Sequence, residues 1–254
     1  MSRNFEILQQ AEEKHRQSQA AVFTPTETIG AAESSRVADA AWGAVELNDF
    51  SNEQVKKLVQ RLFLAPSACK AVVFAGVESG NGCSWITAHC TEFLARHTSA
   101  SVCVVDANLR SPALHQYFQI ANHHGLSDAV LSGGPLENYL HQLSLPNLWL
   151  LSCGSHAGNR PLVLGSESLR SCIAQLRAQF GYVLIDAPAA NACSDVIALG
   201  HAADGVALVL QGSSTRREAV KKAVQDLENA KVRVLGAVMN KRTFPVPSFL
   251  YKRL

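Results

Sequence analysis

The chain has 254 residues, of which 47% are hydrophobic, and this is enough to bury a full α/β core. Its formal net charge of only +2 argues against a general nucleic-acid binder. Seven cysteines, an odd number without a C-x-x-C pair, indicate a reduced, cytoplasmic protein. No stretch reaches the ~20 apolar residues of a membrane-spanning helix, so any membrane contact is expected to be peripheral.

The N-terminal part is expected to precede the folded domain. Residues 3–19 predict a polar helix, and residues 20–49, rich in Ala, Thr, Ser and Glu, predict a mobile linker, which together make an extension over 1–49. A domain is expected over 50–254. It opens with a helix predicted at 51–63, because Ser51 and Gln54 form a capping-box pair and apolar residues follow at helical spacing.

From residue 70 onward, short apolar runs alternate with helical patterns. Strands are predicted at 71–76, 101–106, 148–152, 182–186, 205–211 and 232–239, and helices at 84–96, 165–179, 194–203 and 215–230. Such alternation is typical of βαβ units. The sequence therefore predicts an α/β fold with a mainly parallel sheet and helices on both faces.

The run AVVFAGVESGNGCSW at 71–85 has the outline of a phosphate-binding P-loop, a glycine turn between a strand and a helix N-terminus. Gly80, Gly82 and Ser84 match the pattern G-x-x-x-x-G-K-S/T, but Cys83 stands where the pattern has lysine. The loop predicts nucleotide binding without that positive charge. The alternative is an ordinary βα turn that binds nothing, and Cys83 is interpreted as a small buried filler in preference to a reactive thiol.

Two predicted strands end in aspartate, at Asp106 and Asp186. Because ligands of open α/β sheets bind outside the carboxyl ends of the strands, both carboxylates should lie on the same rim as the glycine loop. Ser84 and Asp186 suit Mg²⁺, directly or through water, and Asp106 suits either the metal or an attacking hydroxyl. The alternatives are a capping role for Asp106 and a simple turn at Asp186.

These residues resemble the bacterial tyrosine kinases of capsular and exopolysaccharide systems, a branch of the P-loop ATPases related to the MinD and ParA partition ATPases. The likeness runs from about residue 50 to 254. It rests on DANLRSPALH at 106–115, GLSDAVLSG at 125–133, the turn at 159–161, and the segments 164–188 and 203–220. The resemblance implies a P-loop NTPase fold of the MinD/ParA-related class.

The resemblance also implies ATP and Mg²⁺ as cofactors. It places Asp106, Asn108 and Asp186 as catalytic positions, the first two in a second Walker-type motif and the third as the Walker B carboxylate. The metal positions are Ser84, Asp106 and Asp186, and Asn240 is a base contact. The remaining cofactor-binding positions are those of the loop: Gly80, Asn81, Gly82, Cys83, Ser84 and Trp85.

The implied role is a cytoplasmic tyrosine autokinase that regulates polysaccharide synthesis and export with a membrane-embedded co-polymerase, or chain-length regulator, and that assembles into homo-oligomers. Cys83, Asn108 in place of a second aspartate, and a lone Tyr251 near the C-terminus predict weak activity. One alternative is an inactive pseudokinase scaffold, and another is a partition ATPase, whose loops commonly carry an early lysine that 76–84 lacks.

The C-terminal 40 residues have an excess of basic residues. From 215 to 254 there are ten Lys or Arg against three Asp or Glu, an excess of seven. This pattern predicts a solvated helix face, and its alternative is peripheral contact with an anionic partner or with acidic lipids at the inner face of the cell membrane. No specific nucleic acid is expected as a partner.

Overall fold

The structure is a computed structural model, and it describes residues 49–65, 68–155, 160–192, 194–212 and 214–241. The helix predicted at 3–19 and nearly all of the predicted linker lie outside the described residues. The first position of the predicted turn at 159–161 and Tyr251 also lie outside the described residues.

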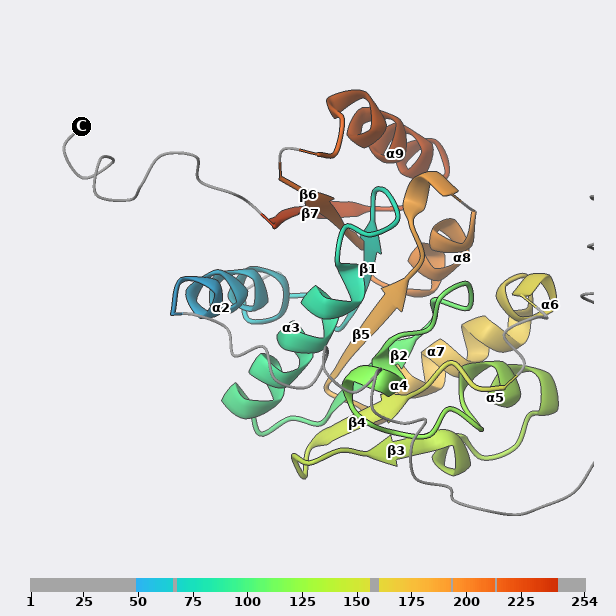
Figure 1. The fold of residues 1–254 in the computed structure, drawn as a ribbon. Helices are drawn as coiled ribbons and strands as arrows, with labels where there is room; N and C mark the ends of the chain where they lie inside the picture. The colour runs from blue at the N-terminus through green and yellow to red at the C-terminus, as the bar shows by residue number, and fades with distance from the viewer. Residues whose placement is uncertain (1–48, 66–67, 156–159, 193, 213, 242–254) are drawn as a thin grey trace, which may run out of the picture. The chain divides into compact units, whose positions relative to one another are not determined.

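A seven-stranded sheet in the order β3-β4-β2-β5-β1-β6-β7 lies at the centre of the domain (Figure 1). Its strands are β1 (Ala71–Gly76), β2 (Val102–Asp106), β3 (Leu140–Gln142), β4 (Leu148–Leu151), β5 (Tyr182–Ala187), β6 (Val206–Gln211) and β7 (Val234–Asn240). The short β3 pairs antiparallel with β4, and the other neighbouring strands are parallel. The predicted mainly parallel α/β sheet is thus confirmed.

Helices follow most of the strands. They are α2 (Asp49–Phe63), α3 (Cys83–His97), α4 (Leu114–Tyr117), α5 (Leu126–Ser132), α6 (Arg160–Leu164), α7 (Glu167–Gln179), α8 (Asp195–Ala202) and α9 (Arg217–Asn229), with the 3-10 turns η1 (Leu136–Tyr139) and η3 (Ala190–Ala192). Helix α2 begins at Asp49, so the predicted capping-box residue Ser51 lies within the helix and is not its N-cap, which corrects the prediction.

The predicted strands and longer helices are present with ends that differ by a residue or two, whereas α4, α5, α6 and β3 were not predicted. These four elements have three to seven residues each, which is too short for hydrophobic periodicity to reveal. Strand β3 exists because its residues pair with β4, Leu140 lying opposite Leu151. Such a strand depends on a tertiary partner more than on its own sequence.

The central strands are buried on both faces, so alternate residues enter two separate cores. One face of β1, with Val72 and Phe74, packs under α2 and α3. The other face, with Val73 and Ala75, packs against the layer that includes α7, α8 and α9. Figure 1 shows these two helical layers on opposite sides of the sheet. This double burial is why the strands are nearly continuous apolar runs.

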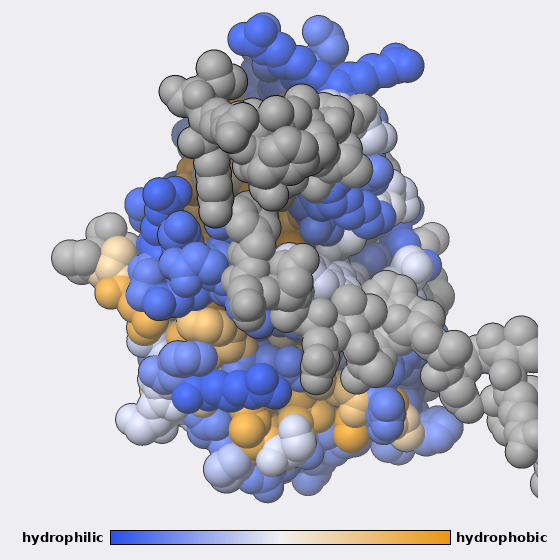
Figure 2. Space-filling model, turned by 60° about the vertical axis from the view of Figure 1, so that its left-hand side comes forward, coloured by the Kyte–Doolittle hydropathy of each residue, from blue (hydrophilic) through white to orange (hydrophobic). Residues whose placement is uncertain are grey.

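The surface of the domain is mixed. On the face shown in Figure 2, apolar side chains form separate patches between hydrophilic areas where the surface is described. The large apolar residues that are exposed in the described part are Leu64, Leu131, Leu162 and Met239. Scattered exposure of this kind is ordinary for a folded domain. Within the described ranges, no helix has the length and apolar character to span a membrane.

Strand order places a crevice at the carboxyl end of the sheet. The chain passes from β1 to β2, returns to β5 between them, and then continues to β6 on the other side of β1. The strand order therefore changes direction at β1, and open α/β sheets bind ligands at such a point. The glycine loop, Asp106, Asp186 and Asn240 all lie where strands of this rim end.

Candidate functional site

The glycine loop joins β1 to α3 and depends on two left-handed glycines. Gly80 and Gly82 both have φ of 81°, a region that residues with a Cβ rarely adopt. Gly82 is the N-cap of α3 and makes no side-chain cap, so the first N–H groups of the helix have no capping side chain. A helix start of this kind is suited to an anion.

Asn81 holds the loop in place from within. Its side chain is buried, its Oδ1 accepts a hydrogen bond from the N–H of Glu78 at 2.8 Å, and its Nδ2 donates to Oγ1 of Thr215 at 3.3 Å. Thr215 lies after β6, so this side chain links the loop to the neighbouring strand. Asn81 therefore shapes the loop, and its backbone carbonyl remains available to a further partner.

That partner comes from the end of β7. Asn240 Nδ2 donates to the Asn81 carbonyl at 3.0 Å, and Lys241 Nζ donates to the Gly80 carbonyl at 2.9 Å. A Cβ at position 82 would overlap with Nδ2 of Asn240 and would displace that amide, and the φ angle of 81° also favours glycine there. The loop and the end of β7 thus form one unit across 159 residues of sequence.

Ser84 and Asp186, two of the predicted metal positions, are in direct hydrogen-bond contact. The Ser84 hydroxyl donates to Oδ2 of Asp186 at 2.5 Å, while Oδ1 of Asp186 is buried without a hydrogen-bond partner in the described structure. Burial raises the pKa of Asp186 to about 8, with the nearby Asp106 adding to the increase and the Ser84 hydroxyl opposing it. A buried carboxyl with an unpaired oxygen favours a bound cation, which would restore its ionised form.

Asp106 has different surroundings although it lies beside Asp186 in the sheet register. Its Oδ1 accepts from the N–H of Asn108 at 3.2 Å, and its Oδ2 accepts from the N–H groups of Ala113 and Leu114, both at 3.0 Å. Burial raises its pKa to about 6, and these three hydrogen bonds act in the opposite direction. Asp106 thereby anchors the chain from β2 to the start of α4.

Cys83 supplies no charge to the loop. Burial and the adjacent Asp186 raise the pKa of its thiol well above the ordinary value, so the thiol is neutral near pH 7. A neutral thiol does not favour the reactive alternative and contrasts with the lysine of the P-loop pattern, but the side chain is not fully buried as the filler interpretation expected. The position is partly exposed and lines the cavity described below.

The motif after β2 continues to the surface. Asn108 turns the chain, with its Oδ1 accepting from the N–H of Ser111 at 3.2 Å. Arg110 Nε lies 3.1 Å from Oδ2 of Asp195 at the start of α8. Asn108 is therefore at the rim of the site, whereas Arg110 ties the motif to a helix on the far face of the sheet.

A cavity of about 580 Å³ joins these parts. It is lined by Gly76, Glu78, Ser79, Gly80, Asn81, Gly82, Cys83, Ser84, Trp85, Asn108, Ser111, Ala113, Ala187, Ala189, Asn240 and Lys241. All six predicted loop positions are present, together with Asn108 and Asn240. Asp106 and Asp186 lie beneath this wall. Lys241 was not predicted, and the signal that points to it is a basic residue directly after a strand at the ligand-binding edge.

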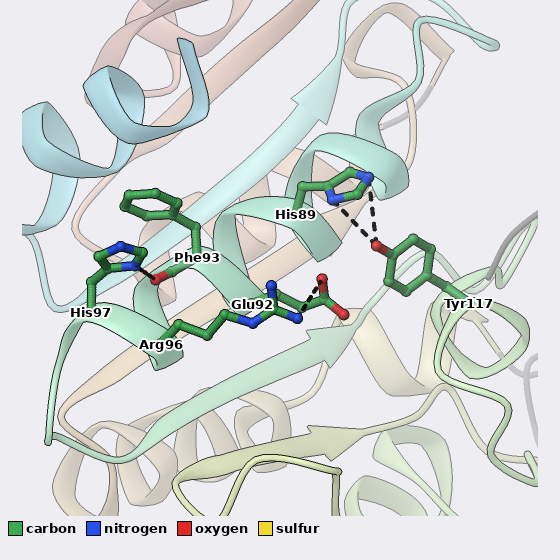
Figure 3. A network of polar contacts seen from close by, with 6 residues as sticks. All are labelled: His89, Glu92, Phe93, Arg96, His97 and Tyr117. Atoms are coloured by element: carbon green, nitrogen blue, oxygen red, sulfur yellow. Dashed lines mark hydrogen bonds and ion pairs between the residues drawn. The ribbon is translucent and has the colours of Figure 1, made fainter. Parts of the chain in front are cut away.

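Aromatic side chains connect α3 to α4 beside the cavity. Trp85 packs edge-on against His89, with ring centroids 4.1 Å apart, and His89 points toward the hydroxyl of Tyr117, 3.3 Å from Nδ1 (Figure 3). Burial and the nearby Arg96 lower the pKa of His89 to about 4, so its ring is neutral near pH 7. Trp85 has one side on the cavity and is held in place by this contact.

The residues present fit a magnesium nucleotide in most respects. Asp186 has an unpaired buried oxygen, Ser84 adds a hydroxyl, the α3 N-terminus lacks a capping side chain, and the cavity has the volume of a small-molecule site. The feature that does not fit is the neutral Cys83 at the lysine position. The fold and this loop define a P-loop NTPase architecture.

Comparison with known proteins finds similarity to bacterial tyrosine kinases. No family model matches the chain. The chain is 29% identical over 171 residues to tyrosine-protein kinase YwqD of Bacillus subtilis strain 168, across 67% of this chain and 72% of the relative. It is 26% identical to the solved BceF tyrosine kinase domain, which covers 74% of this chain and 76% of that domain with a TM-score of 0.66.

A more distant neighbour confirms the fold class. It is cobyrinic acid a,c-diamide synthase from Mycobacterium smegmatis with bound ATP analog and magnesium, at 16% identity, a TM-score of 0.59, and coverage of 67% of this chain and 72% of that chain. This likeness concerns the fold alone. The kinase relatives show that the chain is similar to bacterial tyrosine-protein kinases, in agreement with the resemblance carried by its motifs.

Proposed function

We propose that this chain binds ATP with Mg²⁺ at the carboxyl end of its sheet and belongs functionally with the tyrosine autokinases of its family. The observation that carries the proposal is the Ser84–Asp186 pair, which leaves one buried carboxylate oxygen unpaired beside an uncapped helix start. The loop amides would hold the phosphates, and Ser84 and Asp186 would hold Mg²⁺. The cation would neutralise charge that develops on the transferred phosphoryl group.

The other predicted residues receive proposed roles from their contacts. Asp106 positions the segment from Asn108 to Leu114 through its three backbone hydrogen bonds, and Asn108 faces the cavity where a substrate hydroxyl would approach. Asp106 remains a candidate catalytic and metal position once nucleotide is bound. Asn240, at the loop edge, is a candidate contact for the base.

We propose a regulatory role in exopolysaccharide or capsule synthesis and export, carried out in the cytoplasm with a membrane-embedded co-polymerase. Homo-oligomers and a peripheral contact with the inner membrane face, through the basic C-terminal segment, belong to the same proposal. Weak phosphoryl transfer is expected, because the neutral Cys83 thiol leaves the phosphates without the usual lysine. Loss of one partner of a buried charge pair typically costs about 2–5 kcal/mol.

A second candidate function is that of a pseudokinase scaffold, which binds a partner without performing chemistry. The neutral thiol of Cys83 favours it, since the position offers phosphate no charge. The partition-ATPase alternative has no comparable support, because the loop from Gly76 to Ser84 contains no lysine.

Calorimetric titration of the full chain with ATP, in Mg²⁺ and in EDTA, tests the proposal. Saturable binding that needs Mg²⁺ is expected. Mass spectrometry after incubation with ATP then measures phosphate on tyrosine, with Asp186→Asn as the comparison because it keeps the size of the side chain. Tyrosine phosphorylation lost in Asp186→Asn supports the kinase, binding without transfer supports the scaffold, and absence of binding contradicts the proposed ATP site.

A further inference from the structure

The cavity contains one basic side chain in an otherwise neutral or acidic wall. Among the described residues that line it, Lys241 is the one Lys or Arg, and Glu78 is the one acidic residue. Lys241 directly follows Asn240, the last residue of β7. It reaches the site from the opposite end of the domain's sequence, so the P-loop pattern does not include it.

The Lys241 side chain already touches the loop. Its Nζ donates to the Gly80 carbonyl at 2.9 Å, two residues before the α3 N-cap and three before Cys83. Its Cε lies 3.7 Å from where a Cβ on Gly82 would be. Lys241 therefore lies close to the turn from which the missing lysine would extend.

The backbone at Lys241 is also unusual. Its φ of 50° is in the left-handed region, which residues other than glycine seldom occupy, and its N–H receives support from Oδ1 of Asn240 at 2.8 Å. Residues in such conformations are retained where their surroundings hold them, and they occur often at functional sites. This turn ends β7 directly beside the glycine loop.

The charge of Lys241 is not neutralised by a carboxylate in the described part of the chain. Its ammonium binds a neutral carbonyl, and none of the ion pairs among described residues includes it. A lysine ammonium on a flexible four-carbon stem can exchange a carbonyl for a phosphate oxygen with little displacement. A phosphate would be the stronger partner because the hydrogen bond would join opposite charges.

We propose that Lys241 supplies, within the same chain, the positive charge that the glycine loop lacks at Cys83, and that it binds the phosphates of the nucleotide. This inference rests on the proposed nucleotide site. It assigns to the end of β7 a role in phosphate binding beyond its hydrogen bonds to the loop. The competing role is a structural strap that closes the loop and contacts no ligand.

Calorimetry on the full chain separates these roles. The test uses Lys241→Met, Lys241→Arg and the control Lys231→Met, because Lys231 is also exposed and left-handed, with φ of 59°, but lies outside the cavity. Lys241→Met should weaken ATP·Mg²⁺ binding about tenfold or more, since a hydrogen bond to a charged group is lost. Binding of adenosine should not change, Lys241→Arg should retain most of the affinity, and Lys231→Met should match the natural chain.

A second variant tests whether Lys241 compensates for the cysteine at position 83. Cys83→Lys restores the pattern lysine, so adding Lys241→Met to it should reduce ATP affinity much less than in the natural background. Circular dichroism melts verify that every variant is folded.

If the natural chain binds ATP and Lys241→Met binds it equally well, the inference about Lys241 is overturned but the proposed nucleotide site is retained. It is also overturned if Lys241→Met weakens adenosine as much as ATP, which would place Lys241 on the base. Binding by Cys83→Lys but not by the natural chain would overturn both this inference and the proposed activity of the natural chain. Absence of binding in all variants would do the same.

Discussion

The carboxyl ends of β2 and β5 present two aspartates in the same row of the sheet with opposite hydrogen-bonding states. Asp106 is buried and accepts three backbone N–H groups, which occupy both of its oxygens. Asp186 is equally buried, but one oxygen accepts from Ser84 and the other has no partner among the described residues. The difference lies in their hydrogen-bond partners more than in their positions in a motif. Asp106 organises the chain after β2, whereas Asp186 is available to a cation.

Replacing either aspartate tests this difference, and the largest expected effect is on stability. Asp106→Ala leaves three backbone N–H groups without their acceptor, so we expect a loss of about 4 kcal/mol in the free energy of unfolding. Asp186→Ala removes one hydrogen bond from a carboxyl whose raised pKa keeps it mostly protonated near pH 7 when no cation is bound, so its effect should stay within about 1 kcal/mol. Urea denaturation in EDTA measures both. Equal losses would show that the three backbone contacts of Asp106 do not set it apart.

The next effect concerns nucleotide binding. Asp186→Asn keeps the size of the side chain but loses the charge that Mg²⁺ requires, so we expect ATP affinity in Mg²⁺ to fall about 30-fold, to the level seen in EDTA. Asp226→Asn, on the exposed face of α9 in an ion pair with Lys222, is the matched control. If Asp186→Asn retains Mg²⁺-dependent binding, another group holds the metal.

The third effect is a pH dependence. The pKa of Asp186 in the folded chain is raised to about 8, above its value in the unfolded chain, so stability is complete at low pH and is lost as pH rises toward 8. In EDTA, Asp186→Asn should therefore gain stability relative to the natural chain by about 3.5 kcal/mol between pH 5 and pH 8. Thermal melts at both pH values provide the test. A constant difference would mean that Asp186 does not titrate in this range.

The smallest effect lies at the surface end of the same motif. Arg110 is 40% exposed and pairs with Asp195 of α8, so Arg110→Ala should cost less than about 1 kcal/mol, and high salt should reduce the difference. Chemical denaturation at low and high salt is the measurement. A loss comparable with that of Asp106→Ala would show that the Arg110–Asp195 pair stabilises the motif as much as the buried carboxyl of Asp106 does.

The strongest predictions from the sequence were those that depend on local pattern. Apolar runs such as 71–76 and 182–186 predicted strands, because strands buried on both faces must be apolar throughout. Ser84 and Asp186 were predicted as a metal pair, and their side chains meet although 102 residues separate them. The strand-end rule was sufficient for that pairing, since parallel strands bring their carboxyl ends to one edge.

Local pattern did not reveal the elements and contacts that depend on distant partners. Strand β3 is three residues long and exists through its pairing with β4. The partners of Asp106 are backbone groups seven and eight residues away at Ala113 and Leu114, and a backbone group has no signature in the sequence. Lys241 was likewise missed, because a single lysine after a strand does not indicate which loop it will reach.

By itself, the sequence determined the alternating α/β architecture, the glycine loop with cysteine in place of lysine, and the two strand-end aspartates, since each is written in adjacent residues. The tertiary structure decided which carboxylate is saturated and which is open, and it brought Asn240 and Lys241 onto the loop. The physical reason is that hydrogen-bond partners and charge neutralisation depend on positions in space. Chain segments far apart in sequence set those positions only when the sheet is assembled.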